Sequence, residues 1–205
     1  EAKNKKMNIV DATCPLVRDI HDEIKALEND GRKIIIIGDH GHDEVIGIAS
    51  QVKNPTIVAT AEEANQLRKT KRAGVVSQST QTIENVQDIV NILMSKVVDL
   101  RFVNTICFPT KRNQEQIKEL SNQCDVMFII GSFTSANSKR LTDLSKERNK
   151  RSFQVTCASD INEKWLEDCT TVGISAGAST PDNIIDEVLN RIKEIGNVQE
   201  EEIYA

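Results

Sequence analysis

The run KIIIIG at residues 33–38 decides the fold of the first half of this chain. Four consecutive β-branched residues, bounded by a lysine and a glycine, are typical of a strand buried on both faces in a parallel sheet. The run MFIIG at residues 127–131 has the same character in the second half. We therefore expect each half of the chain to be built around one buried strand.

The sequence on either side of these runs indicates a duplicated module. NIVDATCP at residues 8–15 corresponds to FVNTICFP at 102–109, and Cys14 and Cys107 each precede the strand-ending glycine by 24 residues. A later strand runs into Ser-Thr in each copy, as VVSQST at 75–80 and VGISAGAST at 172–180. Repeats of this length are whole domains, each a small α/β layer structure.

The expected fold class is therefore α/β, with two pseudo-repeated small modules and mainly parallel sheets. The first module covers residues 1–104 and carries Cys14, and the second covers 105–196 and carries Cys107. Residues 197–205 form an acidic tail.

Helical periodicity separates the predicted strands. Apolar residues at helical spacing from Leu16 to Leu27 predict a helix that ends before Gly31. Similar patterns predict helices over 83–93 and 184–192, the latter beginning near Pro181. Thr60 and Glu63 fit a capping box.

Composition excludes several classes of protein. The chain has 39% hydrophobic and 28% charged residues and a net charge of −5, without the basic stripe that nucleic-acid binding requires. No apolar run reaches the ~18 residues of a membrane span, and the first six residues are too polar for a signal peptide. Five cysteines without short spacings argue against a disulfide framework. We expect a cytoplasmic protein with no nucleic-acid or membrane partner.

The loops that follow the predicted strands have an unusual composition. Residues 38–44, 77–82, 131–138 and 175–182 are rich in Ser, Thr, Asn, His and Gly. In open parallel sheets such loops gather at the carboxyl ends of the strands, where ligands bind, and their donors suit an anion. The chain lacks the P-loop and dinucleotide fingerprints, so we do not expect a standard nucleotide site.

Six motifs, in order, resemble the LytB/IspH family of 4-hydroxy-3-methylbut-2-enyl diphosphate reductases. They are DATCPLV at 11–17, GHDEV at 41–45, SQST at 77–80, TIC at 105–107, NSKRL at 137–141 and AGASTP at 176–181. Each alone is weak, but six in the family's order are specific. The resemblance covers nearly the whole chain.

The resemblance implies a 4Fe-4S cluster at the centre of three modules, with one cysteine ligand from each. Cys14 and Cys107 would be two ligands, and we expect the third in an N-terminal module that precedes Glu1 and is missing here. An isolated cytosolic cysteine is more often a buried thiol, and this is our interpretation of Cys124, Cys157 and Cys169.

The resemblance also implies roles for polar residues. Glu44 would be the catalytic acid, because loss of an allylic hydroxyl as water needs a proton. Taken alone, Glu44 could be a first-turn acid, His42 a loop residue, and the Ser, Thr and Asn residues N-caps. The residues expected around the diphosphate substrate are His42, Ser79, Thr80, Ser135, Asn137 and Ser179.

The implied function is an iron-sulfur oxidoreductase of non-mevalonate isoprenoid biosynthesis. It would convert 4-hydroxy-3-methylbut-2-enyl diphosphate to isopentenyl and dimethylallyl diphosphate, with electrons from a donor such as ferredoxin or flavodoxin. Two alternatives remain open at this point. One is a non-catalytic diphosphate-binding α/β module without a cluster, and the other is a truncated, poorly folded product.

Overall fold

The computed structural model describes residues 10–196, and the chain divides into two compact units, Glu1–Ile106 and Cys107–Ala205. We call these unit 1 and unit 2. The sequence places the boundary after residue 104, and the structure places it after residue 106. The expected acidic tail at 197–205 lies outside the described residues.

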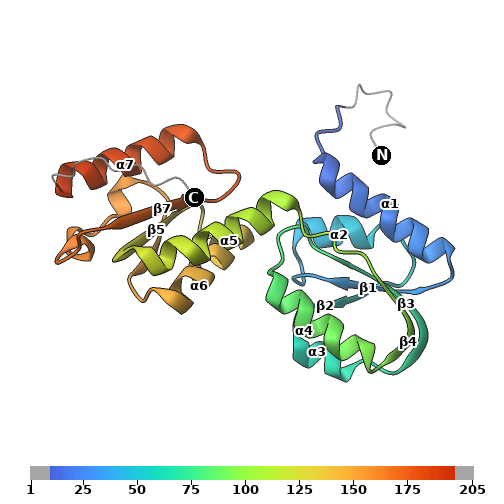
Figure 1. Cartoon of the computed structure of the whole chain (residues 1–205). Coiled ribbons are helices and arrows are strands. Elements are labelled where there is room, and N and C mark those ends of the chain that lie inside the picture. The colour runs from blue at the N-terminus through green and yellow to red at the C-terminus, as the bar shows by residue number, and fades with distance from the viewer. Residues whose placement is uncertain (1–9, 197–205) are drawn as a thin grey trace. The chain divides into compact units, whose positions relative to one another are not determined.

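Unit 1 contains a parallel four-stranded sheet with helices on both faces (Figure 1). The strand order is β2-β1-β3-β4. Its elements are α1 (Pro15–Asn29), β1 (Lys33–Ile37), α2 (Asp43–Ala49), β2 (Thr56–Val58), α3 (Ala61–Gln66), β3 (Thr70–Ser77), α4 (Ile83–Met94) and β4 (Val97–Phe102).

The central strand β1 is buried on both faces, as its sequence predicts. Ile35 and Ile37 belong to a core cluster that includes residues of α3 and α4. Ile34 and Ile36 point the other way, into a cluster with residues of α1 and α2. Burying one such side chain contributes about 1.5–3 kcal/mol, so this strand anchors both layers of unit 1.

Unit 2 repeats this plan with three parallel strands, in the order β6-β5-β7. Its central strand β5 also alternates between two core clusters, with Phe128 in one and Met127 in the other. The elements are α5 (Phe108–Gln123), β5 (Val126–Ile130), α6 (Ala136–Arg148), β6 (Ser152–Val155), the 3₁₀ turns η2 (Ala158–Asp160) and η3 (Glu163–Leu166), β7 (Val172–Ala176) and α7 (Asp182–Gly196).

The two units are equivalent down to single hydrogen bonds at their strand ends. The Gln78 N–H donates to the Ile37 carbonyl at 2.8 Å, and the Gly177 N–H donates to the Ile130 carbonyl at 2.9 Å. The prediction of two pseudo-repeated α/β modules with mainly parallel sheets is therefore confirmed.

This equivalence gives the register of the Ser-Thr pair in each unit. Ser77 pairs with Ile37 in unit 1, and Ala176 pairs with Ile130 in unit 2. The Ser-Thr pair therefore begins two residues beyond the strand end in unit 1 and three residues beyond it in unit 2. The two Ser-Thr pairs therefore differ by one residue in register, because backbone pairing, rather than residue identity, sets the register.

The predicted helix ends are confirmed at α1. Gly31 has φ +70°, and it follows the C-cap residue Asp30. The Gly31 N–H donates to the Glu28 carbonyl and the Arg32 N–H to the Leu27 carbonyl. These two bonds form a Schellman motif, which favours glycine at the left-handed position.

The expected capping box at α3 is only half present. The Glu63 N–H donates to Thr60 Oγ1 at 3.4 Å. The reciprocal bond comes from the Ala59 N–H rather than from Thr60, and Glu63 also contacts His40.

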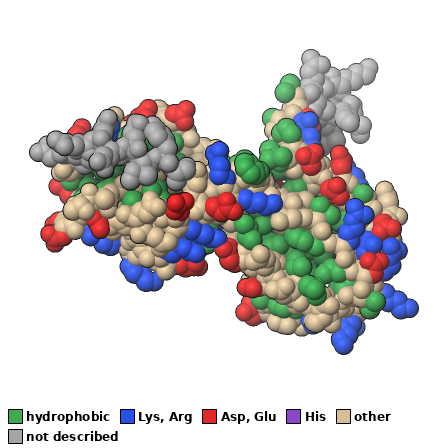
Figure 2. Space-filling model, in the orientation of Figure 1, with side chains coloured by type: hydrophobic (Ala, Val, Ile, Leu, Met, Phe, Trp, Pro, Cys, Tyr) green, Lys and Arg blue, Asp and Glu red, His purple; other side chains and the backbone are tan. Residues whose placement is uncertain are grey.

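The residues that lead into Cys14 form no described strand. Residues 10–13 have no regular secondary structure, and residues 8 and 9 lie outside the described range. Among the described helices, none is both long enough and apolar enough to cross a membrane. Figure 2 shows acidic and basic side chains interspersed over the visible face.

Candidate functional site

Glu44 and Ser79 meet at the carboxyl ends of β1 and β3 in unit 1. The Glu44 carboxylate accepts a hydrogen bond from the Ser79 N–H at 2.6 Å and from Ser79 Oγ at 2.8 Å. Ser79 is only 7% exposed. Glu44 therefore has both oxygens oriented in a partly buried position, at the place where ligands bind in such sheets.

A glycine makes this approach possible. A Cβ atom on Gly38, directly after β1, would lie 2.6 Å from Val45 Cγ2 and 3.2 Å from Gln78 Cβ. Because real Cβ contacts are not that short, only glycine lets α2 begin so close to the strand end.

His42 is the N-cap of α2, and its ring faces the helix backbone. Its Nδ1 accepts a hydrogen bond from the Glu44 N–H at 3.2 Å. An accepting Nδ1 in a neutral imidazole assigns the proton to Nε2. His42 can therefore act as a cap and as a donor to an external acceptor at the same time.

Gln78 is a residue of this site that sequence reasoning missed. It is fully buried, and its Oε1 accepts from the Asp39 N–H at 3.0 Å while its Nε2 donates to Thr80 Oγ1 at 2.9 Å. Gln78 thus connects the loop after β1 with the loop after β3 and orients Thr80. Its place inside the SQST motif was the available signal.

His21 on α1 has a buried ring nitrogen, Nε2, that lacks a hydrogen-bond partner. It is the one such side-chain atom in the part of the chain that the structure describes. A Cβ on Gly47 of α2 would lie 3.8 Å from this atom, so the ring lies at the contact between α1 and α2. Burial lowers the pKa of His21, and the charge of Lys25 lowers it further, while the carboxylates of Asp22, Glu44 and Asp11 oppose this effect. The lowered pKa favours the uncharged form of His21.

Cys14 and Cys107 occupy matched positions as the N-caps of α1 and α5, but their surroundings differ. Cys14 is exposed and Cys107 is half-buried. The sulfur of Cys107 lies 2.9 Å from Thr110 Oγ1. Within residues 10–196, no group of three or more His, Cys, Asp or Glu side chains is placed to hold a metal.

The other three cysteines all lie in unit 2, outside the motifs that carry the family resemblance. Burial raises the pKa of Cys124, and Cys169 donates to the Leu166 carbonyl at 3.1 Å. Hydrogen bonds from Ser159 and Thr156 lower the pKa of Cys157. None of the three caps an α-helix at its N-terminus.

In unit 2, the loops after β5 and β7 lie against each other. A Cβ on Gly177 would come 2.5 Å from Ser138 Oγ, and one on Gly131 would overlap the same hydroxyl. Thr180 Oγ1 donates to the Ile130 carbonyl at 3.0 Å. The two loops that carry the expected residues of unit 2 are therefore neighbours.

The expected residues of unit 2 lie on these loops and in the first turn of α6. Ser135 is the N-cap of α6 and accepts from the Ser138 N–H at 3.3 Å. Asn137 is the second residue of α6, and Ser179 is exposed in the turn before α7. Glu44 is likewise the second residue of α2, so Glu44 and Asn137 hold equivalent positions in the two units.

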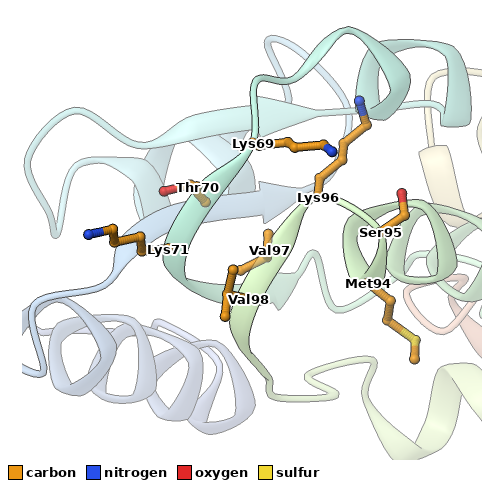
Figure 3. A pocket seen from close by; sticks show the side chains of 8 residues that line it. All are labelled: Lys69, Thr70, Lys71, Met94, Ser95, Lys96, Val97 and Val98. Carbon is orange, nitrogen blue, oxygen red and sulfur yellow. The ribbon is translucent and has the colours of Figure 1, made fainter.

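A separate pocket of about 530 Å³ lies at the opposite ends of the strands, where β3 and β4 begin. Lys69, Lys71 and Lys96 line it (Figure 3). Lys96 Nζ donates to the carbonyls of Asn65 and Leu67, and Lys71 points away from the other two lysines in Figure 3. None of the expected site residues lines this pocket.

Comparisons with known proteins agree on one family. The family model described as "LytB protein" matches residues 1–193. The chain is 41% identical over 196 residues to the 4-hydroxy-3-methylbut-2-enyl diphosphate reductase of Pelobacter propionicus, covering 95% of this chain and 70% of that protein. It is 38% identical over 200 residues to the reductase of the same name from Aquifex aeolicus, covering 95% and 69%.

Two solved structures are similar. The E-1-hydroxy-2-methyl-but-2-enyl-4-diphosphate reductase from Plasmodium falciparum matches with a TM-score of 0.88 and 27% identity, over 94% of this chain and 62% of that one. A structure of (E)-4-hydroxy-3-methyl-but-2-enyl diphosphate reductase, the terminal enzyme of the non-mevalonate pathway, matches with a TM-score of 0.63 and 36% identity, over 94% and 70%.

Proposed function

This chain belongs to the LytB protein family, and from that premise we propose that it is a 4-hydroxy-3-methylbut-2-enyl diphosphate reductase. The reaction would remove the allylic hydroxyl and yield isopentenyl and dimethylallyl diphosphate. The observation that carries the proposal is the Glu44–Ser79 contact, which orients a carboxyl group at the strand ends where a substrate would bind.

Two cysteines fit an iron-sulfur cluster. Thiolates are the usual ligands of such clusters, and Cys14 and Cys107 are the N-cap residues of α1 and α5, one in each unit. When bound, a 4Fe-4S cluster supplies the electrons that the reduction needs. A small external protein such as ferredoxin or flavodoxin would supply the electrons in turn, and the proposed location is the cytoplasm.

Glu44 is the proposed acid. A hydroxyl group leaves as water only if it receives a proton, and a positioned carboxyl group typically contributes about 10²–10⁴-fold to such a step. Ser79 fixes both oxygens of Glu44, so the proton is presented in one direction.

Donors for the diphosphate group are proposed in each unit by itself. His42 Nε2 and the Thr80 hydroxyl are the proposed donors of unit 1, together with Ser79. In unit 2 the proposed donors are Ser135, Asn137 and Ser179, next to the N-terminal N–H groups of α6. Free N–H groups at a helix N-terminus favour phosphate oxygens.

The first experiment measures iron and sulfide per chain after anaerobic reconstitution, with Cys14→Ser as the control. About four iron atoms per chain, lost in the variant, would mean that Cys14 and Cys107 hold a cluster in this chain. Iron that is equal in both proteins contradicts the assignment of Cys14. Diphosphate binding without any iron would instead favour the alternative of a binding module.

The second experiment compares Glu44→Gln with Asp43→Asn, a matched change at the neighbouring exposed carboxylate of α2. Glu44→Gln should keep the iron content and lower turnover by about 10²-fold or more, whereas Asp43→Asn should stay near the parent. Equal turnover in Glu44→Gln and the parent would overturn the role of Glu44.

A further inference from the structure

The two helix-capping cysteines differ in the residue three positions further along the chain. Cys14 is followed by Val17 in α1, and Cys107 is followed by Thr110 in α5. Both residues occupy the third helical position after their cysteine N-cap. The repeat has therefore placed an apolar residue at this helical position in unit 1 and a hydroxyl-bearing residue at the same position in unit 2.

Thr110 is turned toward the sulfur of Cys107. It is 5% exposed, and its Oγ1 lies 2.9 Å from Cys107 Sγ. Within the part of the chain that the structure describes, the Thr110 hydroxyl makes no other hydrogen bond. A buried hydroxyl needs a partner, because leaving it unsatisfied costs about 1–3 kcal/mol, and the sulfur supplies that partner.

The direction of the hydrogen bond follows from the charge state of a metal ligand. A thiolate carries no hydrogen, so with an ionised Cys107 the Thr110 hydroxyl must donate. Such a bond fixes the side-chain rotamer of Cys107 and draws negative charge away from the sulfur. Hydrogen bonds to the sulfurs are one of the factors that set the reduction potential of an iron-sulfur cluster.

We propose that Thr110 is a positioning residue for Cys107, which orients its sulfur and makes the cysteines of the two units electronically unequal ligands. Cys107 is the ligand of lower electron density, and Cys14, with Val17 in place of the hydroxyl, is the ligand of higher electron density. This inference rests on the proposed function, because it treats both cysteines as cluster ligands.

The first test needs no cluster. The metal-free full chain is treated with iodoacetamide at an alkaline pH where the thiols are ionised, and the labelling rate of Cys107 is divided by that of Cys14. Thr110→Val has nearly the same shape but no donor, so the ratio should rise about three- to tenfold, since a hydrogen-bonded thiolate is the weaker nucleophile. Thr110→Ser should keep the parent ratio.

Unit 1 provides the converse variant. Val17→Thr introduces a hydroxyl at the equivalent position beside Cys14 and should slow the labelling of Cys14 while leaving Cys107 unchanged. An unchanged ratio in Thr110→Val, or equal ratios in Thr110→Val and Thr110→Ser, would overturn the hydrogen bond itself.

The second test measures the reduction potential of the reconstituted full chain by a redox titration followed by electron paramagnetic resonance. Thr110→Val should shift the potential to a more negative value, and Thr110→Ser should not. A potential that stays unchanged in Thr110→Val overturns the tuning role. If the chain binds no iron, the labelling ratio alone decides whether Thr110 controls Cys107.

Discussion

Ser79 contacts Glu44 through two different atoms, and the two contacts respond differently to mutation. The hydroxyl bond depends on the side chain, whereas the N–H bond belongs to the backbone and survives any substitution except proline. The orientation of Glu44 is therefore protected in part against changes at position 79.

Ser79→Ala should lower turnover by about tenfold, which corresponds to the loss of one hydrogen bond. The loss should be clearly smaller than that of Glu44→Gln, because the backbone donor remains. Steady-state kinetics measure both, with Ser79→Thr as the control that keeps a hydroxyl. Combining Ser79→Ala with Glu44→Gln should be no worse than Glu44→Gln alone, and a fully additive loss would contradict the idea that Ser79 acts through Glu44.

For single residues, the sequence predicts which residue types lie at the site better than it predicts their hydrogen-bond partners. Glu44 and Ser79 were expected in neighbouring loops, and the structure adds their direct hydrogen bonds. Gln78 and Thr110 were not expected, because a polar residue in a loop or first turn looks the same whether it faces solvent or a buried partner. Only the tertiary placement distinguishes these two cases.

Helices and strands depend on a few close approaches that no periodicity reveals. A Cβ on Gly74 in β3 would lie 2.8 Å from Leu27 Cβ on α1. The helix therefore rests directly on the strand backbone. By contrast, the nearest atom to a Cβ on Gly47 of α2 would be 3.8 Å away, which is ordinary contact distance.

Gly74→Ala should therefore lower the free energy of unfolding of unit 1 by about 1–3 kcal/mol, as expected when a packed core is overfilled. Gly47→Ala is the matched control and should raise it by about 0.5–1 kcal/mol, because alanine is the better helix former. Urea denaturation followed by far-UV circular dichroism measures both. A destabilised Gly47→Ala together with a neutral Gly74→Ala would contradict this packing.

A second feature at this scale is the carboxylate that ties the start of β5 to the segment before β7. Asp125 accepts hydrogen bonds from the Thr170 N–H and hydroxyl at 2.8 Å each and from the Thr171 N–H at 3.0 Å. These bonds lower the pKa of Asp125 from 3.8 to about 2. Its charge thus stabilises the folded state most strongly above the unfolded value, near pH 4.

The stabilisation by Asp125 should be lost as the pH falls from about 4 to about 2, because in this window the unfolded state binds a proton at Asp125 that the folded state does not bind. Asp125→Asn should unfold at a lower denaturant concentration than the parent at neutral pH, and the difference should shrink through this window. Asp143→Asn, an exposed change on α6, is the control. A difference that is independent of pH would contradict the assignment.

The elements with regular apolar patterns could be predicted from sequence. Burial on two faces gives β1 and β5 continuous apolar runs, and burial on one face gives α1, α4 and α7 apolar residues at helical spacing. The ends were less predictable. The half-formed box at α3 depends on where the Glu63 carboxylate finds its second donor, and the Ser-Thr register depends on pairing between distant strands.

In the whole molecule, each unit has hydrophobic core clusters of its own. The aromatic side chains of these clusters lie mainly in unit 2. Trp165, the single tryptophan of the chain, lies in unit 2 and stacks on Phe153 with ring centroids 4.0 Å apart. Its fluorescence therefore reports on the folding of unit 2, whereas circular dichroism reports on both units.

The two units should therefore unfold as separable transitions. Gly74→Ala in unit 1 should shift part of the transition seen by circular dichroism and leave the Trp165 fluorescence midpoint unchanged. Asp125→Asn in unit 2 should shift the fluorescence midpoint. If both variants move both signals equally, the units unfold together as one cooperative block.

The shared strand-end geometry also has an evolutionary consequence. Gly38 and Gly131 hold equivalent positions in their units, and at both a Cβ atom would come too close to a side chain of the following helix. Neither glycine could have been replaced after the duplication unless the start of that helix moved. The equivalent positions Glu44 and Asn137 differ between the copies, with a carboxyl group in one and an amide in the other. Saturation mutagenesis of the two units should therefore find the same intolerance to substitution at Gly38 and Gly131. At Glu44 and Asn137 the tolerated residues should differ, because the two copies have acquired different roles there since the duplication.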